Sequence, residues 1–376
     1  MSGTSADGID AALVEIKGHG LSIAVRLLTC TSAPYPRKLQ TQILHTCDSG
    51  TGPEVCDLNV MLGERFAKAA SKLIRLSGLT ERDIHLIGSH GQTLYHHPRA
   101  PHRSTLQIGE PSIIAERTGI TTVADFRPRD MAAGGEGAPL TPYAHQILFQ
   151  HRTRSRLIVN LGGICNVTYI PFETKKRTIA AFDVGPGNMM INNAMIFMTN
   201  GKAFQDTSGA TAARGRVDGA LLASLLKHPF LKRRPPKSTG REEFGDTYVR
   251  RLMREAKQRR MRNEDFLATV TAFTAQTASA SQRFLNGQVD EVILAGGGTR
   301  NRTLVKELRT AFFPTPVNTA EAYEWNSKAI EAVAFAILAY QTFHETPNNL
   351  PSVTGARHAV VMGKIIPGRS FRGRIS

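Results

Sequence analysis

The chain has 376 residues, a hydrophobic content of 41% and a formal net charge of +16. This length exceeds what a single hydrophobic core usually covers, so we expect two domains. No run of 18 apolar residues occurs, which excludes a bilayer-spanning helix and makes a membrane partner unexpected. The first residues lack the basic and apolar regions of a signal peptide, and we expect a globular, cytoplasmic protein.

The positive charge is concentrated in two segments, residues 232–237 and 250–262. Neither segment interleaves the aromatic side chains that stack on bases, so we interpret both as solvated surfaces and expect no nucleic-acid partner. The spacings of the four cysteines match no zinc pattern, and we expect reduced thiols. These cysteines are Cys30, Cys47, Cys56 and Cys165.

The chain opens on a polar, glycine-rich turn over residues 2–8, followed by an alternating segment, residues 9–14, that predicts a strand. Asp-Gly before an alternating segment is a hairpin signal, and a hairpin also needs a strand before its turn. We therefore expect the first strand of this domain to be missing from the sequence, which would leave an unpaired sheet edge.

Polar side chains follow short apolar segments in the first half. Residues 84–87 predict a buried strand that ends near His90 and Gln92, and residues 121–126 predict another that ends at Arg127. Together with a helical periodicity over residues 56–78, this pattern predicts an α/β domain with a polar rim. A basic segment then marks the expected boundary, which divides the chain into domains 1–155 and 156–376.

The second half repeats the pairing of apolar strands with glycine turns. Residues 157–170 predict two strands joined by Gly162 and Gly163. Residues 179–182 predict a short strand ended by residues 185–187, which places Asp183 at a strand's carboxyl end, where open α/β sheets keep ligand crevices. A helix is expected over 188–198. Two interpretations of Asp183 stay open at this point: a helix cap or a catalytic carboxylate.

A third glycine turn, Gly296 to Gly298, follows a predicted strand near residue 289, and a final apolar helix over 329–343 carries Glu331. Three such turns favour a bound nucleotide, because glycine lets backbone amides approach phosphate oxygens. The sequence contains neither GxxxxGK[ST] nor a GxGxxG after a first strand, which argues against P-loop and dinucleotide folds. Phosphoryl transfer, by contrast, needs a carboxylate base and a metal ion.

The motifs, taken together and in order, resemble those of the anhydro-N-acetylmuramic acid kinase family. They lie at residues 1–10, 88–93, 124–127, 132–140, 181–188, 236–242 and 296–301. The resemblance implies an α/β fold of the ASKHA type, with two ribonuclease-H-like (actin/hexokinase-type) domains around a central nucleotide-binding cleft. It also implies the cofactors ATP and Mg²⁺ and a small anhydro-sugar substrate, and it leaves a homodimer open.

The family's activity, implied by the same resemblance, opens the 1,6-anhydro bond of anhydro-N-acetylmuramic acid and phosphorylates O6. The product, N-acetylmuramic acid 6-phosphate, belongs to peptidoglycan recycling and amino-sugar metabolism. By this analogy Asp183 is the general base that directs water at the anomeric carbon.

The resemblance also implies three groups of binding residues, each carried over by position. The nucleotide residues would be Gly3, Thr4, Ser5, Ala6, Asp7, Gly8, Ile9, Asp10, Gly162, Gly163, Gly296, Gly297 and Gly298. The sugar residues would be His90, Gln92, Arg127 and Glu331, and Asp7 is a candidate metal ligand.

The chain departs from the family pattern at Asn192, where the family usually has Asp, and at Glu324, where it usually has Gly. Two alternatives stay beside the main expectation: a kinase for another anhydro sugar such as levoglucosan, and a catalytically silent relative that binds nucleotide or sugar. The absent first strand and Asn192 motivate the second. Lys237 and Arg241 are equally open to interpretation as surface charge or as part of a site.

Overall fold

The computed structural model describes residues 1–3, 6, 8–172, 178–369 and 371. The chain forms two compact units, one made of Met1–Leu148 together with Ala329–Ser376, and the other of Phe149–Lys328. The sequence predicted a single boundary near residue 155, with everything after it in the second domain. The structure instead groups the last segment with the first unit, because helix α13 (Ile330–Phe343) packs against strands of that unit.

The described residues of the first unit form an α/β assembly of three small sheets and their helices. The sheets have the strand orders β1-β2, β12-β6-β3 and β4-β5. The strands are β1 (Gly8–Lys17), β2 (Ala24–Pro34), β3 (Ile87–Gly88), β4 (Gln92–His97), β5 (Ser104–Ile108), β6 (Thr122–Ala124) and β12 (Lys364–Ile366). Besides α13, the helices are α1 (Arg37–Ser49), α2 (Gly52–Leu76), α3 (Pro111–Thr118), α4 (Phe126–Ala132), α5 (Thr141–Phe149) and α14 (Pro351–Thr354).

Strand β1 pairs antiparallel with β2, the strand that follows it, from Gly8 opposite Pro34 to Lys17 opposite Ala24. The left-handed φ values of Gly18 and Gly20 allow the chain to reverse between the two strands. On the other side of β1, the Asp10 amide donates to the Met1 carbonyl at 2.9 Å. The strand predicted over residues 9–14 is therefore present and pairs with the strand that follows it, while the expected strand before the first turn stays a prediction.

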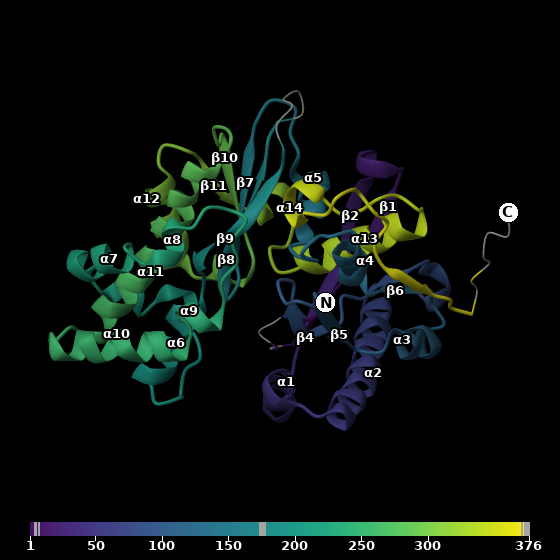
Figure 1. The fold of residues 1–376 in the computed structure, drawn as a ribbon, viewed down its shortest axis with the longest axis horizontal. Coiled ribbons are helices and arrows are strands. Elements are labelled where there is room, and N and C mark those ends of the chain that lie inside the picture. The colour runs from purple at the N-terminus through teal and green to yellow at the C-terminus, as the bar shows by residue number, and fades with distance from the viewer. Residues whose placement is uncertain (4–5, 7, 173–177, 370, 372–376) are drawn as a thin grey trace. The chain divides into compact units, whose positions relative to one another are not determined.

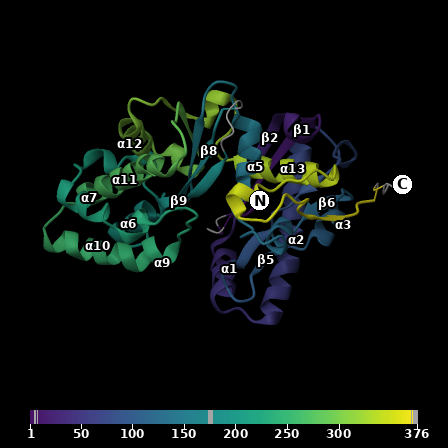
Figure 2. The same cartoon turned by 45° about the horizontal axis from the view of Figure 1, so that its top comes forward.

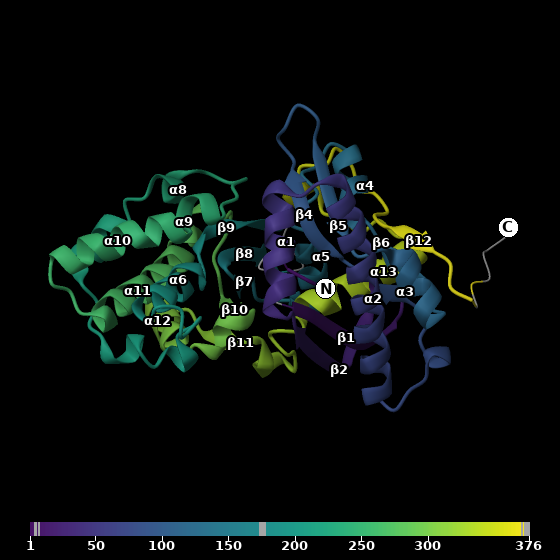
Figure 3. The same cartoon turned by 90° about the horizontal axis from the view of Figure 1, so that it is seen from below.

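Helix α2 illustrates how the sequence determines the first unit. A capping box between Thr51 and Glu54 satisfies its first amides, so the helix begins four residues earlier than the periodicity alone predicted. Leu58, Leu62 and Phe66 recur at helical spacing and are buried. This apolar face packs on α3 and β1, and Figure 3 shows α2 beside these two elements.

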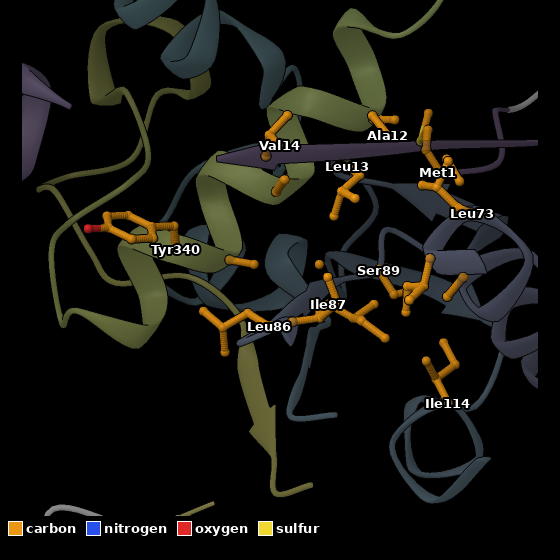
Figure 4. A pocket seen from close by; sticks show the side chains of 18 of the residues that line it. Met1, Ala12, Leu13, Val14, Leu73, Leu86, Ile87, Ser89, Ile114 and Tyr340 are labelled. Carbon is orange, nitrogen blue, oxygen red and sulfur yellow. The ribbon is translucent and has the colours of Figure 1, made fainter. Parts of the chain in front are cut away.

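A cavity of about 480 Å³ lies within the first unit (Figure 4). Its walls come from β1, α2, the segment that leads into β3, and α13. Leu13, Leu73 and Ile87 are among its apolar lining residues, and Tyr340 lies at one end. The cavity thus adjoins both the β1-β2 hairpin and the β12-β6-β3 sheet.

A buried carboxylate attaches the returning C-terminal segment to the first unit. Asp130, on α4, is fully buried and accepts hydrogen bonds from the Asn349 side chain at 2.7 Å, the Thr354 hydroxyl at 2.7 Å and the Gly137 amide at 2.8 Å. Figure 2 shows the yellow C-terminal elements among the blue elements of this unit. Asp130 therefore joins the loop after α4 to a segment more than 200 residues later.

The second unit is built on one five-stranded sheet of order β11-β10-β7-β8-β9. Its strands are β7 (Arg156–Leu161), β8 (Ile164–Ile170), β9 (Ala180–Pro186), β10 (Glu291–Ala295) and β11 (Val317–Thr319). Its helices are α6 (Met189–Met198), α7 (Gly219–Leu225), α8 (Pro229–Lys232), α9 (Arg241–Phe244), α10 (Asp246–Gln258), α11 (Asn263–Ala280) and α12 (Arg302–Phe312).

One face of this sheet packs on the helices, as the green elements of Figure 1 show. Alternate residues of β7, among them Leu157 and Val159, join Phe266 and Phe273 of α11 in a single core. The core fixes the strands and therefore the turns at their ends. Among the described residues, no helix is long and apolar enough to cross a membrane.

Candidate functional site

Three glycine-rich turns of the second unit meet at one edge of its sheet. Strands β7 and β10 are parallel, and β9 runs in the same direction because each of its two steps from β7 is antiparallel. The carboxyl ends of these three strands therefore share an edge. Gly162 and Gly163 follow β7, Gly187 follows β9, and Gly296 to Gly298 follow β10. The fold thus brings together turns that lie more than 130 residues apart in the sequence.

Close backbone contacts hold the three turns together. The amides of Gly187 and Asn188 donate to the carbonyls of Gly163 at 2.9 Å and Gly162 at 2.8 Å, and the Asn188 side chain donates to the Leu161 carbonyl at 3.1 Å. A Cβ at Gly187 would lie 2.3 Å from the Gly162 carbonyl oxygen, and one at Gly298 would lie 2.6 Å from Leu161 Cβ. Glycine is required at both positions for this approach.

Asp183 lies in β9 and is partly buried. The prediction that residues 185–187 end the strand just after Asp183 is wrong, because Gly185 and Pro186 still pair with Cys165 and Ile164 of β8. One carboxylate oxygen of Asp183 accepts from the Thr239 amide at 3.0 Å. This oxygen is held by a neighbouring segment rather than by α6, whose N-terminus receives no side-chain cap. The helix-cap interpretation of Asp183 is therefore wrong.

The surroundings of Asp183 raise its pKa from 3.8 to about 6, chiefly because burial penalises the charged carboxylate. The Thr239 amide and the Lys237 ammonium oppose this shift, while Glu242 adds to it. Burial also raises the pKa of the neighbouring Cys165 thiol, with a further contribution from Asp183. Asp183 is thus ionised at neutral pH yet more basic than an exposed aspartate, as a general base requires.

The first unit gathers two of the predicted sugar residues with the opening turn. Gln92 accepts from the Ser2 hydroxyl at 2.7 Å and donates to the Gly3 carbonyl at 3.2 Å. The buried His90 ring lies 3.3 Å from the Ser2 carbonyl through Nδ1 and packs 4.6 Å from the Phe335 ring. His90 and Gln92, which the resemblance assigns to the sugar, thus lie beside the first glycine turn, and their sugar role stays a prediction.

The other two predicted sugar residues are linked to His90: Arg127 contacts its ring, and the charge of Glu331 acts on Arg127. Arg127 donates to His90 Nε2 at 2.8 Å and to the Gly137 carbonyl at 2.7 Å. Because the guanidinium is a donor only, His90 accepts at Nε2 and carries its proton at Nδ1. Burial and the Arg127 charge hold the pKa of His90 well below its ordinary value. Burial lowers the pKa of Arg127 to about 10, against the opposing charges of Glu331 and Asp130.

The predicted first phosphate loop divides into two parts. Thr4, Ser5 and Asp7 lie outside the described residues. The Ala6 amide donates to the Gly3 carbonyl at 3.1 Å, and Gly8 packs against the backbone of β2. Ile9 is buried in the core, and the Asp10 carboxylate accepts a hydrogen bond from the Ser32 hydroxyl. Ile9 and Asp10 thus have structural partners of their own, whereas Gly3 lies beside Gln92.

Within the described residues, no group of three or more His, Cys, Asp or Glu side chains is arranged to hold a metal ion. The candidate ligand Asp7 lies outside those residues.

Sequence reasoning underestimated two neighbours of Asp183. It left Lys237 open as surface charge, but this side chain is only 7% exposed, whereas Arg241 is exposed. It did not single out Thr239, whose amide holds the Asp183 carboxylate. The available signal was their position in the motif at residues 236–242, although burial of a lysine is not apparent from sequence.

A carboxylate with a raised pKa, in the strand that leads into one of three converging glycine turns, fits the phosphotransferases of the kinase class. The family model described as anhydro-N-acetylmuramic acid kinase matches residues 1–368. The chain belongs to this family, and its structure confirms the predicted α/β class.

Two curated relatives carry the name anhydro-N-acetylmuramic acid kinase. The protein of Caldanaerobacter subterraneus subsp. tengcongensis is 50% identical, with 97% of this chain and 95% of the relative covered. That of Bacillus cereus (strain G9842) is 43% identical, with 97% of each chain covered.

Solved structures of lower similarity also match. The activator of the 2-hydroxyisocaproyl-CoA dehydratase from Clostridium difficile with bound ADPNP is 12% identical, with a TM-score of 0.45 over 92% of this chain and 94% of that one. A ROK family glucokinase from Streptomyces griseus in complex with glucose and AMPPNP is 12% identical, with a TM-score of 0.38 over 88% of this chain and 100% of that one.

Proposed function

We propose that the protein is an ATP-dependent kinase that opens the 1,6-anhydro bond of anhydro-N-acetylmuramic acid and phosphorylates O6. The product would be N-acetylmuramic acid 6-phosphate, an intermediate of peptidoglycan recycling. The observation that carries the proposal is Asp183, a carboxylate with a raised pKa beside three converging glycine turns. The names of the relatives supply the substrate.

In this mechanism Asp183 takes a proton from the water that attacks the anomeric carbon. The bond between that carbon and O6 breaks, O6 forms a bond to the γ-phosphorus of ATP, and ADP leaves. The Thr239 amide orients the carboxylate, because it donates to one oxygen and leaves the other for water. His90, Gln92, Arg127 and Glu331 are the proposed sugar residues.

The glycine turns fit a nucleotide. A Cβ added at Gly297 would meet no atom within 4 Å, and one at Gly163 would meet only the end of the Met189 side chain at 3.7 Å. Both backbones therefore face open space that a phosphate or ribose can occupy, and exposed glycine amides suit phosphate oxygens. ATP would lie against these turns, and the Mg²⁺ that accompanies it would neutralise phosphate charge.

The direct test is turnover. The purified protein with MgATP and anhydro-N-acetylmuramic acid is expected to release ADP and N-acetylmuramic acid 6-phosphate in equal amounts, measured by coupled assay and mass spectrometry. A higher kcat/KM for levoglucosan would reassign the substrate. ATP binding without turnover of either sugar would contradict the proposal and favour the catalytically silent alternative.

The pH profile of kcat/KM should have an acidic limb set by Asp183. A general base works only when unprotonated, and the pKa of this carboxyl is raised to about 6. We therefore expect kcat/KM to fall about tenfold per pH unit below about pH 6 and to be level above it. A limb near pH 4 would show that an unperturbed carboxylate, not Asp183, acts as the base.

A pair of glycine substitutions separates nucleotide contact from packing. Gly297→Ala should leave the melting temperature unchanged, because its Cβ meets no atom within 4 Å, yet weaken ATP binding about tenfold by filling the nucleotide space. Gly187→Ala should lower stability by about 1 to 3 kcal/mol, because its Cβ would strike the Gly162 carbonyl. Calorimetric ATP titration and thermal melting measure both. Full ATP affinity in Gly297→Ala would contradict the nucleotide assignment.

A further inference from the structure

A short segment outside the sheet holds both the backbone and the side chain of Asp183. β9 is the last strand in the order of its sheet. The Asp183 amide donates to the Lys237 carbonyl at 3.2 Å, and the Thr239 amide donates to the Asp183 carboxylate at 3.0 Å. Residues 237–239 therefore cover the free edge of β9 at the position of Asp183.

The Lys237 side chain fixes this segment from the opposite face of β9. Side chains alternate along a strand, so Phe182 and Val184 face away from Asp183. The Lys237 ammonium lies 4.5 Å from the centre of the Phe230 ring and 4.8 Å from that of Phe284, and it donates to the Phe230 carbonyl at 3.4 Å. Aromatic faces attract a cation, so this cage compensates part of the cost of burying it.

The cage adjoins a cavity of about 270 Å³, which Lys237 lines together with Val184, Thr277 and Arg283. The cavity is bounded by the helix-facing side of β9 and by α11 and the turn after it. A buried lysine is not needed here for folding, because an apolar side chain would fill the cage at lower desolvation cost. The position of Lys237 against β9 indicates a role in placing Asp183 instead.

We propose that Lys237 is a positioning residue for Asp183: its caged side chain fixes residues 237–239 along β9, and this segment orients the Asp183 carboxylate through the Thr239 amide. The proposal rests on the proposed function only in calling Asp183 the base. The positioning itself is a statement about contacts within the second unit.

The charged groups around Asp183 and Lys237 determine how removal of the Lys237 ammonium changes the pKa of Asp183. The charges of Lys237 and of Glu242 on α9 act on Asp183, and Asp183 in turn acts on Cys165 of β8. Burial, followed by the charges of Arg283 and Arg233, lowers the pKa of Lys237 to about 8, against the opposing charges of Asp183 and Glu243. The ammonium is thus largely charged at pH 7 and favours ionised Asp183, so its loss raises the pKa of that carboxyl.

The test replaces Lys237 in the full chain. Lys237→Met keeps the length and removes the charge, and Lys232→Met removes an exposed charge on α8 as the matched control. We expect Lys237→Met to lower kcat about tenfold or more, keep KM for ATP within about twofold, and move the acidic limb of kcat/KM upward by about 0.5 to 1 pH unit. Lys232→Met should match wild type in all three. An unmoved limb in Lys237→Met would overturn the proposal.

A second readout does not depend on turnover. The ¹³C resonance of the Asp183 carboxyl, assigned by its absence in Asp183→Asn, should titrate at higher pH in Lys237→Met than in wild type. In the wild-type protein, the chemical shift of the Thr239 amide proton should titrate with the same midpoint as the Asp183 carboxyl resonance. A Thr239 amide shift that does not follow the Asp183 midpoint would overturn the proposal. Coupled titration in a protein without kinase activity would refute the proposed function while supporting the positioning role.

Discussion

Asp183→Asn is expected to reduce kcat for anhydro-N-acetylmuramic acid by about 10² to 10⁴, the usual contribution of a positioned general base. The asparagine has the same shape and can still accept from the Thr239 amide, but it cannot take a proton from water. ATP affinity should change little, because the glycine turns are untouched. Steady-state kinetics and calorimetric ATP titration measure the two quantities.

The control for this substitution is Asp246→Asn, which removes an exposed carboxylate at the start of α10. It should retain wild-type kcat. If Asp183→Asn kept more than a tenth of wild-type turnover, the base would have to be another group, and the mechanism proposed above would be wrong. Loss of ATP binding in Asp183→Asn would instead indicate damage to the neighbouring turns.

Asp130→Asn is expected to destabilise the protein by about 3 kcal/mol, because hydrogen bonds to a buried charge are strong and the new amide would face a donor. Asp130 is fully buried and accepts from Gly137, Asn349 and Thr354. An added Cβ at Gly135 would lie 2.2 Å from its carboxylate, so the site has no room to rearrange. Urea denaturation followed by circular dichroism measures the effect.

Asp125→Asn is the matched control for Asp130→Asn. Asp125 lies five residues earlier, is partly exposed and pairs with the exposed Lys364 at 2.8 Å. Its backbone is left-handed, with φ of 56°, which asparagine also tolerates. We expect a change of less than about 1 kcal/mol, as for other surface ion pairs. Equal destabilisation by the two substitutions would show that the burial of Asp130 is not what matters.

The sequence predicted the α/β class and the family well, because both depend on local patterns. Apolar strands followed by glycine turns are visible in the chain at Gly162, Gly187 and Gly296, and parallel strands then bring such turns to one edge. Asp183 stood out for the same reason. Its role as the base stays a prediction, as do the nucleotide and sugar assignments.

What sequence could not supply are the interactions between distant segments. Asp130 looks like any polar residue of a helix until Asn349 and Thr354 contact it. The sequence leaves Lys237 open as surface charge or part of a site, whereas the structure buries it against the rings of Phe230 and Phe284. Both burials involve a residue remote in the chain, such as Asn349 for Asp130 and Phe284 for Lys237, which no local periodicity contains.

The discontinuous first unit also sets an order for folding during synthesis. Phe149–Lys328 form an uninterrupted unit, whose sheet is complete once β11 has left the ribosome. The first unit, although it begins earlier, lacks α13 and β12 until the last part of the chain emerges. The middle of the chain can therefore reach its native state before the beginning does, reversing the usual N-terminal-first sequence of events.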